Sequence, residues 1–393
     1  MTATATAADV HSDSRWALLE RSITVCPLSH PGAAAAATVS TTTSTGRAVR
    51  VSLHLATPPA SSSCVHFYTD DPGANNKSLV RKPIPRLMAA DEDLLLIHMT
   101  ITPEGDLLDP NGMPIYYYRP DNFFVLNDWA GNPRATGIMR SGKGEEYVVA
   151  SLMPDAVLDG QEERLVFTLW IYRSTTREWR SRQLDSPDGP HGAGECGWDN
   201  DAVFPFQGYM CWVNYHRGIL FCKLVLDDDD DAELRLGFVP FPGIEMSTRD
   251  LFPQPDMYRT VSAVGGLLKF VDVDNGDMRS STGGDCTIIT TWTLRSLGLG
   301  FDRWELDDKI RLEDDLWSLP NYQESPLPRI VPRFPVFSMN SPNAVHFILN
   351  RPGYSDKCWM ITVDMKNKSL ASYSLYNKAS AQDCDQDGSN LST

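Results

Sequence analysis

The stretch from Cys211 to Asp231 gathers most of the residue types that can do chemistry. It reads CWVNYHRGILFCKLVLDDDDD and holds two cysteines, one histidine and five consecutive aspartates. Thiolates can bind zinc or attack a substrate, and carboxylates can bind calcium. The spacing argues against a metal site. The cysteines form no C-x-x-C pair and have no pair of histidines at zinc-ligand spacing, and calcium needs spaced oxygen ligands that converge on one point.

A β-hairpin followed by a charged loop accounts for the same stretch. Two apolar runs flank the residues HRG, and Gly218 is expected to adopt a positive φ at the turn. Cys211 and Cys222 are predicted to face each other across the hairpin as small buried hydrophobic residues. The run Asp227–Asp231 is predicted to be a solvated loop, because adjacent like charges repel one another.

Two other motifs resemble binding sites in part. The tail carries DCDQDG (Asp383–Gly388), which matches the first half of an EF-hand loop, but the glutamate six residues after the glycine is missing. The segment SGKGEE (Ser141–Glu146) leads into a strand pattern, so it is predicted to be a hairpin turn and not a phosphate-binding loop. No Walker, nucleophile-elbow or H-E-x-x-H motif occurs in the sequence.

A loose cluster of mixed ligand types lies in the glycine-rich stretch DGPHGAGECGWDND. It consists of His191, Cys196, Asp199 and Asp201, and the many glycines make a flexible connector the better interpretation. Four further histidines lie inside predicted strands and are expected to be structural: His54, His66, His98 and His346. The sequence therefore predicts no catalytic, cofactor-binding or metal-binding residue, and no cofactor.

Composition limits the class of partner and the compartment. The chain has 393 residues and a net charge of −16, so it should repel nucleic acid, and it contains no apolar stretch long enough to span a membrane. Its N-terminus has neither a basic region nor an apolar core, so it is not a secretory signal. We expect an intracellular protein, cytoplasmic or nuclear, with reduced thiols. The sequons at Asn76, Asn367 and Asn390 would then be unused.

The elements that would position these residues are predicted to be β-strands almost throughout. In Ala48–Ala56 apolar and polar residues alternate, as on a half-buried strand. Further strands are predicted at Val65–Tyr68, Leu94–Met99, Ile115–Tyr118, Phe123–Leu126, Tyr147–Leu152, Leu165–Tyr172, Ile219–Leu226, Leu267–Val273, Cys286–Leu294, Val345–Leu349 and Cys358–Asp364. One short helix is predicted near Glu313–Leu319.

A loose repeat with a spacing of about 40–50 residues, the length of a propeller blade, runs from Arg164 to Tyr376. The four passes are Arg164–Leu184, Gly208–Gly243, Arg259–Leu306 and Asn343–Tyr376. They predict an all-β fold, a propeller-like array of antiparallel sheets, with a β-sandwich pair as the alternative. In the ring arrangement, a strand at Trp16–Val25 would pair with the C-terminal blade.

The predicted domain organisation is a disordered N-terminus (residues 1–14), one propeller-like domain (15–376) and a disordered tail (377–393). Within the domain, PGAAAAATVSTTTSTG (31–46) is of low complexity and is predicted to be an expanded loop between strands Trp16–Val25 and Ala48–Leu55.

Several segments resemble a plant family, expanded in grasses, that is known as domain of unknown function 1618. They are WVNYHRGILFCKLVL, RTVSAVGGLLKFVDV, FPVFSMNSPNAVHFILN and WMITVDM, with SRWALLERSITV similar to the family's first strand. The resemblance runs from about Trp16 to Tyr376 and is most recognisable over about 208–340. The family usually has acidic residues where this chain has Asn214 and Lys223. It has no established activity, so it implies no catalytic residue.

Two classes of function fit these observations. The first is a non-enzymatic protein-interaction scaffold with an unknown protein partner, because a repeated β-scaffold occurs without a catalytic motif. The alternative is a carbohydrate- or small-molecule-processing enzyme on the same scaffold, for which Asp272 and Asp364 at strand ends are the candidate carboxylates. An aspartate at such a position more often caps a turn. Some relatives resemble domains associated with F-box proteins, but this chain shows no F-box opening.

Overall fold

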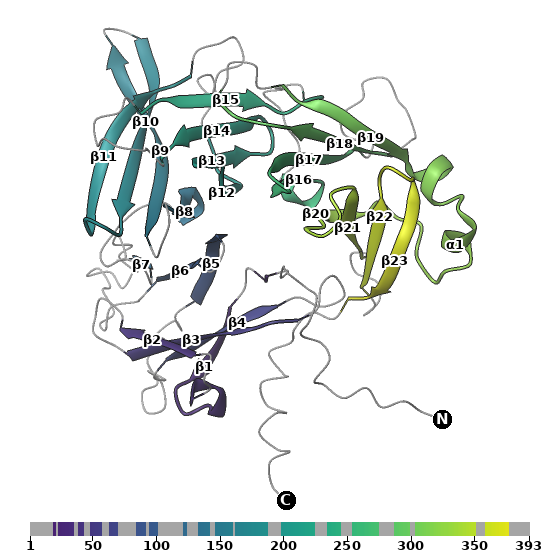
Figure 1. The fold of residues 1–393 in the computed structure, drawn as a ribbon, viewed down its shortest axis with the longest axis horizontal. Coiled ribbons are helices and arrows are strands. Elements are labelled where there is room, and N and C mark those ends of the chain that lie inside the picture. Colours follow the sequence, from purple (N-terminus) through teal and green to yellow (C-terminus); the bar gives the residue numbers. More distant parts are fainter. Residues whose placement is uncertain are drawn as a thin grey trace, which may run out of the picture. The chain divides into compact units, whose positions relative to one another are not determined.

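The computed structural model describes residues 19–20, 23–34, 38–42, 48–56, 63–69, 84–91, 94–100, 121–123, 133–141, 146–159, 162–187, 198–224, 234–244, 254–274, 287–298, 303–350 and 358–376. The chain forms two compact units (Figure 1): one comprises Met1–Arg140 with Lys378–Thr393, and the other comprises Ser141–Asn377. The predicted disordered ends, 1–14 and 377–393, and the predicted strand Ile115–Tyr118 lie outside the described residues.

The second unit is a series of antiparallel sheets, each built from strands that follow one another along the chain. The first sheet has the order β9 (Tyr147–Asp159), β10 (Glu162–Arg173) and β11 (Glu178–Asp185). The next is β12 (Ala202–Phe206), β13 (Tyr209–Asn214), β14 (Gly218–Lys223) and β15 (Leu236–Pro240). The third is β16 (Arg259–Val264), β17 (Leu267–Asp274), β18 (Ile288–Leu294) and β19 (Glu305–Arg311). The fourth is β20 (Arg333–Phe337), β21 (Ala344–Leu349), β22 (Trp359–Asp364) and β23 (Ser369–Leu375).

The sheet β16–β19 is buried on both faces because β17 places apolar side chains on both sides. Leu268 and Phe270 belong to a hydrophobic cluster shared with β13–β15. Val271 and Val273 belong to a second cluster shared with β21 and β22. A sheet that packs against a different neighbour on each face cannot be half of a two-layer sandwich. The packing therefore confirms the predicted propeller-like array of small antiparallel sheets and excludes the sandwich pair for this unit.

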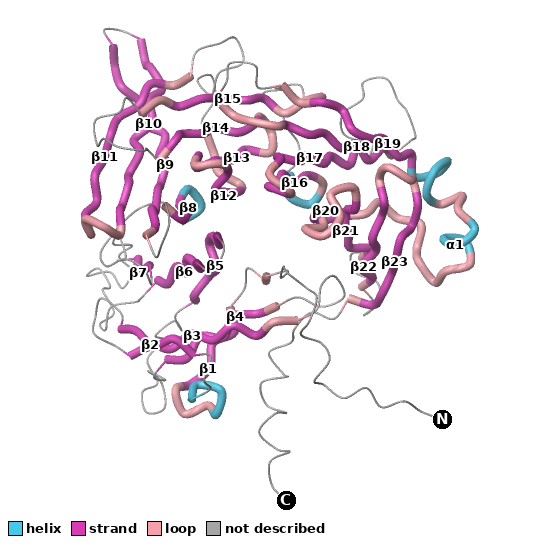
Figure 2. Tube along the Cα trace, viewed as in Figure 1, coloured by secondary structure: helices cyan, strands magenta, loops and turns pink. Residues whose placement is uncertain are grey.

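Helical structure is confined to short turns in the described residues, as Figure 2 shows in cyan. The helix predicted near Glu313–Leu319 corresponds to a π-helical turn, η4 (Leu312–Leu316), and a single α-helical turn, α1 (Pro320–Gln323). A 3₁₀ turn, η3 (Pro255–Met257), precedes β16. Leu312, Leu316 and Tyr322 are buried in the cluster between the third and fourth sheets, so these turns extend that cluster.

The predicted hairpin is present, but its register and turn differ from the prediction. Asn214 pairs with Gly218, so Cys211 lies opposite Phe221 and Cys222 lies opposite Met210. The two cysteines therefore do not face each other. A shift of one residue reverses the face that a strand side chain occupies, which places the thiols on opposite sides of the sheet.

Gly218 is required for a different reason than the expected positive φ. It is the first residue of β14, and its φ is not among the positive values of the described glycines. A Cβ atom at Gly218 would lie 2.2 Å from the carbonyl oxygen of Val239 and 2.8 Å from the Cα of Pro240. The glycine therefore permits the close approach of β15 to β14.

The first unit contains a four-stranded sheet in the order β1-β4-β3-β2 and a three-stranded sheet β5-β6-β7. The strands of these sheets are β1 (Thr24–Pro27), β2 (Thr38–Thr42), β3 (Ala48–His54), β4 (Cys64–Thr69), β5 (Ile84–Asp91), β6 (Leu94–Thr100) and β7 (Asp121–Phe123), with 3₁₀ turns η1 (Pro31–Ala34) and η2 (Pro133–Ala135). A further strand of this unit, β8 (Thr136–Arg140), belongs to neither sheet. The backbone N–H of Arg140 donates to the Asp91 carboxylate at 2.7 Å, which ties β8 to β5.

Two predictions for the first unit are wrong. In the described part of the N-terminal strand, pairing is with β4 and not with the C-terminal blade: β1 lies parallel to β4, and Leu19 forms a parallel bridge to Ser63. The predicted loop 31–46 contains η1 and the strand β2, which pairs with β3. Threonine and valine have high β-propensity, and pairing with β3 turns this low-complexity segment into the edge of a sheet.

Candidate functional site

The turn between β13 and β14 is held by several hydrogen bonds from side chains. The Asn214 carbonyl oxygen Oδ1 accepts a hydrogen bond from the backbone N–H of His216 at 2.9 Å, and its Nδ2 donates to the backbone oxygen of Asp199 at 2.9 Å. The backbone N–H of Arg217 donates to the backbone oxygen of Asn214 at 2.9 Å. A carboxylate in place of Asn214 would lack the donor to Asp199. The hydrogen bonds of this turn therefore explain why an asparagine stands at position 214 in this chain.

Asp201 belongs to the predicted ligand cluster, and it has a structural partner. Its Oδ2 accepts a hydrogen bond from the backbone N–H of Tyr215 at 2.7 Å. Burial raises the pKa of this carboxyl, while the amide of Tyr215 and the nearby His216 oppose the shift. Asp199 contributes its backbone oxygen to the same turn. His191 and Cys196 lie outside the described residues, as do Asp227–Asp231 and Asp383–Gly388.

Asp272, one of the two candidate catalytic carboxylates, forms a buried ion pair. Its Oδ1 lies 2.8 Å from Nε of Arg259, which is directly opposite on β16, and the two side chains are 7% and 3% exposed. Nη1 of Arg259 also donates to the backbone oxygen of Tyr215 at 2.6 Å. The pair thus connects the third sheet to the turn of the second. A carboxylate so engaged supports the packing of two sheets.

Asp364, the other candidate, caps a turn. Its Oδ1 accepts a hydrogen bond from the backbone N–H of Asn367 at 2.9 Å, and its Oδ2 accepts one from Nδ2 of the same residue at 2.8 Å. This confirms the expectation that an aspartate at a strand end caps a turn. Among the described residues, no group of three or more histidine, cysteine or acidic side chains is arranged to hold a metal ion.

The cysteines of the hairpin are inert. Both thiols are fully buried. Burial raises the pKa of the Cys211 thiol and raises that of Cys222 to about 12. A thiol that stays protonated is a poor nucleophile and a poor metal ligand. The interpretation of both residues as small buried hydrophobic residues is confirmed. Ser141–Glu146 closes with a hydrogen bond from the N–H of Ser141 to the oxygen of Glu146 at 3.0 Å, consistent with a turn.

Sequence reasoning missed a polar face on the sheet of the first unit. Ser52 and His54 of β3 lie beside Cys64, His66 and Tyr68 of β4. Ser52 Oγ is 3.1 Å from His54 Nε2 and 3.0 Å from the Tyr68 hydroxyl, and Cys64 Sγ is 3.4 Å from His66 Nε2. The rings of His54 and His66 are 4.0 Å apart. The signal was available: polar residues at every second position of two strands share one face once the strands pair.

His346 is a buried histidine, as predicted for a strand position. It is 5% exposed, and its Nδ1 is 3.0 Å from Oγ1 of Thr362. Burial lowers the pKa of His346 to about 4, because the charged form is disfavoured in a poorly solvated site.

Acid should therefore destabilise the protein through His346. The unfolded chain binds this proton near pH 6.5 and the folded chain only near pH 4, so stability falls between those values. We expect wild type to lose up to about 3 kcal/mol from this residue across that window, and His346→Gln to lose that much less. Urea unfolding of both proteins at pH 7, 5.5 and 4.5 measures the difference. Parallel pH profiles for the two proteins would contradict the assignment.

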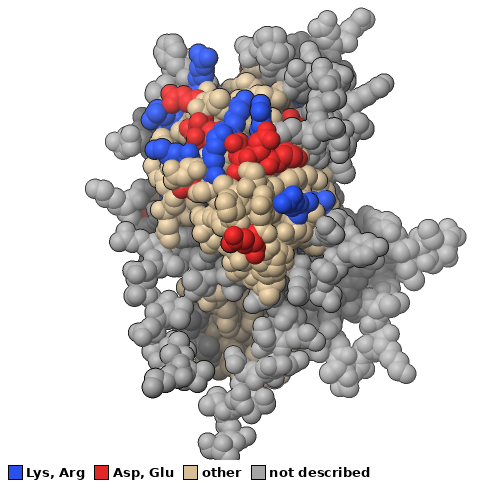
Figure 3. Space-filling view, turned by 90° about the vertical axis from the view of Figure 1, so that its right-hand side faces the viewer, with Lys and Arg blue, Asp and Glu red and all other residues tan. Residues whose placement is uncertain are grey.

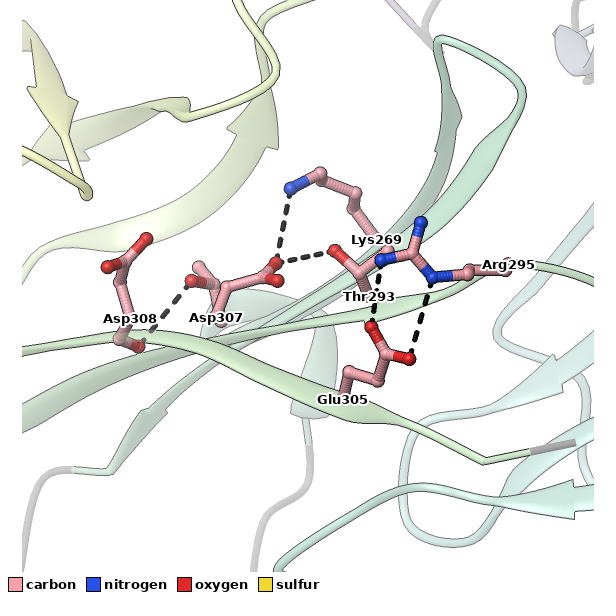
Figure 4. Close-up of polar contacts among 7 residues, drawn as sticks. Lys269, Thr293, Arg295, Glu305, Asp307 and Asp308 are labelled. Carbon is pink, nitrogen blue, oxygen red and sulfur yellow. Dashed lines mark hydrogen bonds and ion pairs between the residues drawn. The ribbon is translucent and has the colours of Figure 1, made fainter.

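Charged side chains on β19 make local pairs (Figure 4). The Asp307 carboxylate accepts hydrogen bonds from Nζ of Lys269 at 3.1 Å and from Oγ1 of Thr293 at 2.6 Å. Arg295 binds Glu305 through Nε at 3.5 Å and Nη2 at 3.0 Å. Lys269 is buried, whereas the Arg295–Glu305 pair is exposed. The carboxylates of Glu305 and Asp307 are thus occupied by cations of the same sheet.

The outer strand β23 differs from β19 in having no charged residue. Its sequence is SLASYSL, and Tyr373 and Leu375 are 43% and 45% exposed. The Tyr373 ring packs edge-on against Trp359 of β22, with ring centroids 6.1 Å apart. On the side shown in Figure 3, acidic and basic groups lie next to one another among uncharged residues. The exposed apolar side chains Tyr373 and Leu375, on a strand without charge, form the candidate site.

The sheet topology and the two shared clusters define an all-β protein of propeller-like class. The family model described as "Protein of unknown function (DUF1618)" matches residues 212–346. Over these residues, the match supports the resemblance to that family seen in the sequence. It includes Arg259, Asp272 and the turn at Tyr215. No helix of the described residues is long and apolar enough to cross a membrane.

Comparisons with other proteins add little. No curated protein matches the chain. A β-fructofuranosidase of family GH32 from Bombyx mori is similar at a TM-score of 0.24 and 8% identity, over 74% of this chain and 58% of that one. The tail fibre of Staphylococcus aureus phage P68 gives a TM-score of 0.16 and 11% identity, over 86% and 83% of the two chains. Likenesses this low carry no information on fold or activity.

Proposed function

We propose that this chain is a non-enzymatic protein-interaction scaffold that binds its partner at the outer strand of the fourth sheet. The observation that carries this proposal is the exposure of Tyr373 and Leu375 on the uncharged strand β23. Tyrosine and other large apolar side chains supply much of the energy of protein interfaces. The candidate carboxylates Asp272 and Asp364 are engaged in structural contacts, so they do not favour the enzymatic alternative.

A protein partner suits the charge of the chain better than nucleic acid does. The net charge of −16 repels a phosphate backbone and attracts a basic protein surface. We place the interaction in the cytoplasm or the nucleus. Fluorescence microscopy of the tagged chain in cells tests this location, and accumulation in the secretory pathway would contradict it.

Affinity purification of the whole chain tests the scaffold proposal. Wild type is compared with the double variant Tyr373→Ser/Leu375→Ser and with Leu306→Ser, in which a leucine on β19 that is even more exposed than Leu375 is replaced. We expect wild type and Leu306→Ser to recover the same protein in stoichiometric amount, and the double variant to recover less than about a tenth of it. The identified protein is then bound to the purified chain. Equal recovery by all three, or no stoichiometric protein with wild type, would overturn the proposal.

A further inference from the structure

The backbone of β23 has hydrogen-bonding groups directed away from its own sheet. The N–H of Tyr376 donates to the oxygen of Cys358 at 2.8 Å, so these residues form a hydrogen-bonded pair. Bonded and non-bonded pairs alternate in an antiparallel ladder. Tyr373 and Leu375 are opposite Ile361 and Trp359 in the non-bonded positions, so their N–H and C=O groups point away from β22. In the described part of the chain, no residue hydrogen-bonds to them.

Two other outer strands of this unit, β11 and β19, carry charged side chains that discourage pairing with a further strand, and a third, β15, ends in a proline; β23 has neither feature. Strand β11 contains four charged residues in EWRSRQLD, and β19 contains five in ELDDKIR. Charged side chains on an edge strand discourage the addition of another strand. Strand β23 contains none and no proline. Its edge therefore combines unprotected backbone groups with exposed apolar side chains.

We propose that β23 accepts an extended segment of the partner protein as an additional antiparallel strand. This inference rests on the proposed scaffold function and specifies how the partner binds. The residues opposite Tyr373 and Leu375 would be apolar, since they lie on the same face and pack against those side chains. The alternate residues would be polar, beside Ser372 and Ser374. The main chain supplies hydrogen bonds, and the alternate side chains supply specificity.

The charge of the chain indicates what flanks this segment. Two copies of a chain with net charge −16 repel each other, so a second copy is a poor occupant of the edge. A segment flanked by lysine or arginine is attracted by the same charge. The partner segment is therefore a short stretch of alternating apolar and polar residues with basic residues on both sides.

A synthetic peptide tests the geometry with the full chain. The probe is fluorescein-labelled Lys-Lys-Thr-Val-Thr-Val-Thr-Lys-Lys with blocked ends, followed by fluorescence anisotropy. In antiparallel addition the valines would face Tyr373 and Leu375, and their N–H groups would donate to β23. N-methylation of the valines should therefore weaken binding at least about tenfold, whereas N-methylation of the threonines should change it less than about threefold. A peptide with glutamates in place of the lysines should bind at least about fivefold more weakly at low salt.

Two variants of the protein test the same edge. Leu375→Pro removes the outward N–H as well as the leucine side chain, whereas Leu375→Ala removes only side-chain atoms. We expect Leu375→Pro to weaken peptide binding at least about tenfold and Leu375→Ala less than about threefold. Circular dichroism spectra that match wild type show that both variants are folded.

Three results would overturn strand addition. They are equal effects of the two methylations, a stable dimer in sedimentation velocity, and no binding of the probe at about 1 mM, an affinity weaker than that of specific recognition. The two proposals can fail separately. If Tyr373 and Leu375 are needed to recover a partner but the two methylations have equal effects, the scaffold function is supported and only strand addition is refuted. If wild type recovers no partner, the scaffold proposal itself fails.

Discussion

Replacing Arg259 with methionine should lower the free energy of unfolding by about 3–5 kcal/mol, because Asp272 would be left charged in a buried site. Both side chains are almost inaccessible, and Arg259 also binds the backbone oxygen of Tyr215. Asp272→Leu should cost about the same, since it leaves the guanidinium without its carboxylate. Urea unfolding followed by tryptophan fluorescence measures both changes.

The double variant Arg259→Met/Asp272→Leu separates the net contribution of the ion pair to stability from the cost of leaving one of its charges unpaired. Apolar residues of similar size often replace a buried pair with little loss, so it should be within about 2 kcal/mol of wild type. Arg295→Met is the matched control, because it breaks an ion pair whose side chains are 68% and 57% exposed. Arg295→Met should leave the free energy of unfolding unchanged within error. Additive losses in the double variant would show that the two charges are not coupled.

Phe270→Ala should lower the free energy of unfolding by a similar amount, for a different reason. The ring is fully buried and stacks on Phe241 at a centroid distance of 4.1 Å, with Trp292 at 5.4 Å and Trp304 at 5.8 Å. Removing it leaves a cavity among rigid aromatic rings that cannot collapse, so about 3–5 kcal/mol should be lost. Equilibrium urea unfolding gives the value.

Phe334→Ala is the control for this substitution, because Phe334 is 42% exposed on β20. It should cost less than about 1 kcal/mol. A loss at Phe270 no larger than that at Phe334 would mean that the aromatic cluster between the second and third sheets is loosely packed.

The strands of the second unit could be predicted because alternation and turn residues are local signals. Each of the four sequence repeats lies within one of its sheets, and the short helical turn after β19 was found as well. The register of the β13–β14 hairpin was not predicted correctly. Three residues, Tyr215 to Arg217, separate the paired Asn214 and Gly218, and this turn length sets which residues face each other. The sequence alone does not distinguish it from a turn one residue longer.

Pairings between distant segments could not be predicted in the same way. The parallel alignment of β1 with β4 joins strands about forty residues apart, and no local pattern encodes it. The ion-pair partner of Asp272 could not be predicted either. Arg259 comes thirteen residues earlier, and only the pairing of β16 with β17 brings the two side chains together. The lack of charge in SLASYSL is visible in the sequence. What makes it relevant is the position of β23 at the edge of a sheet, which only the structure supplies.

The burial of both faces of the sheet β16–β19 has a consequence for how the second unit loses its structure. In a linear array of repeats, each unit is stabilised by its own fold and by the interfaces with its two neighbours. Opening this sheet would remove both hydrophobic clusters at once, so partial unfolding that begins here costs two interfaces. The sheet therefore acts as the cooperative link that makes its neighbours unfold together.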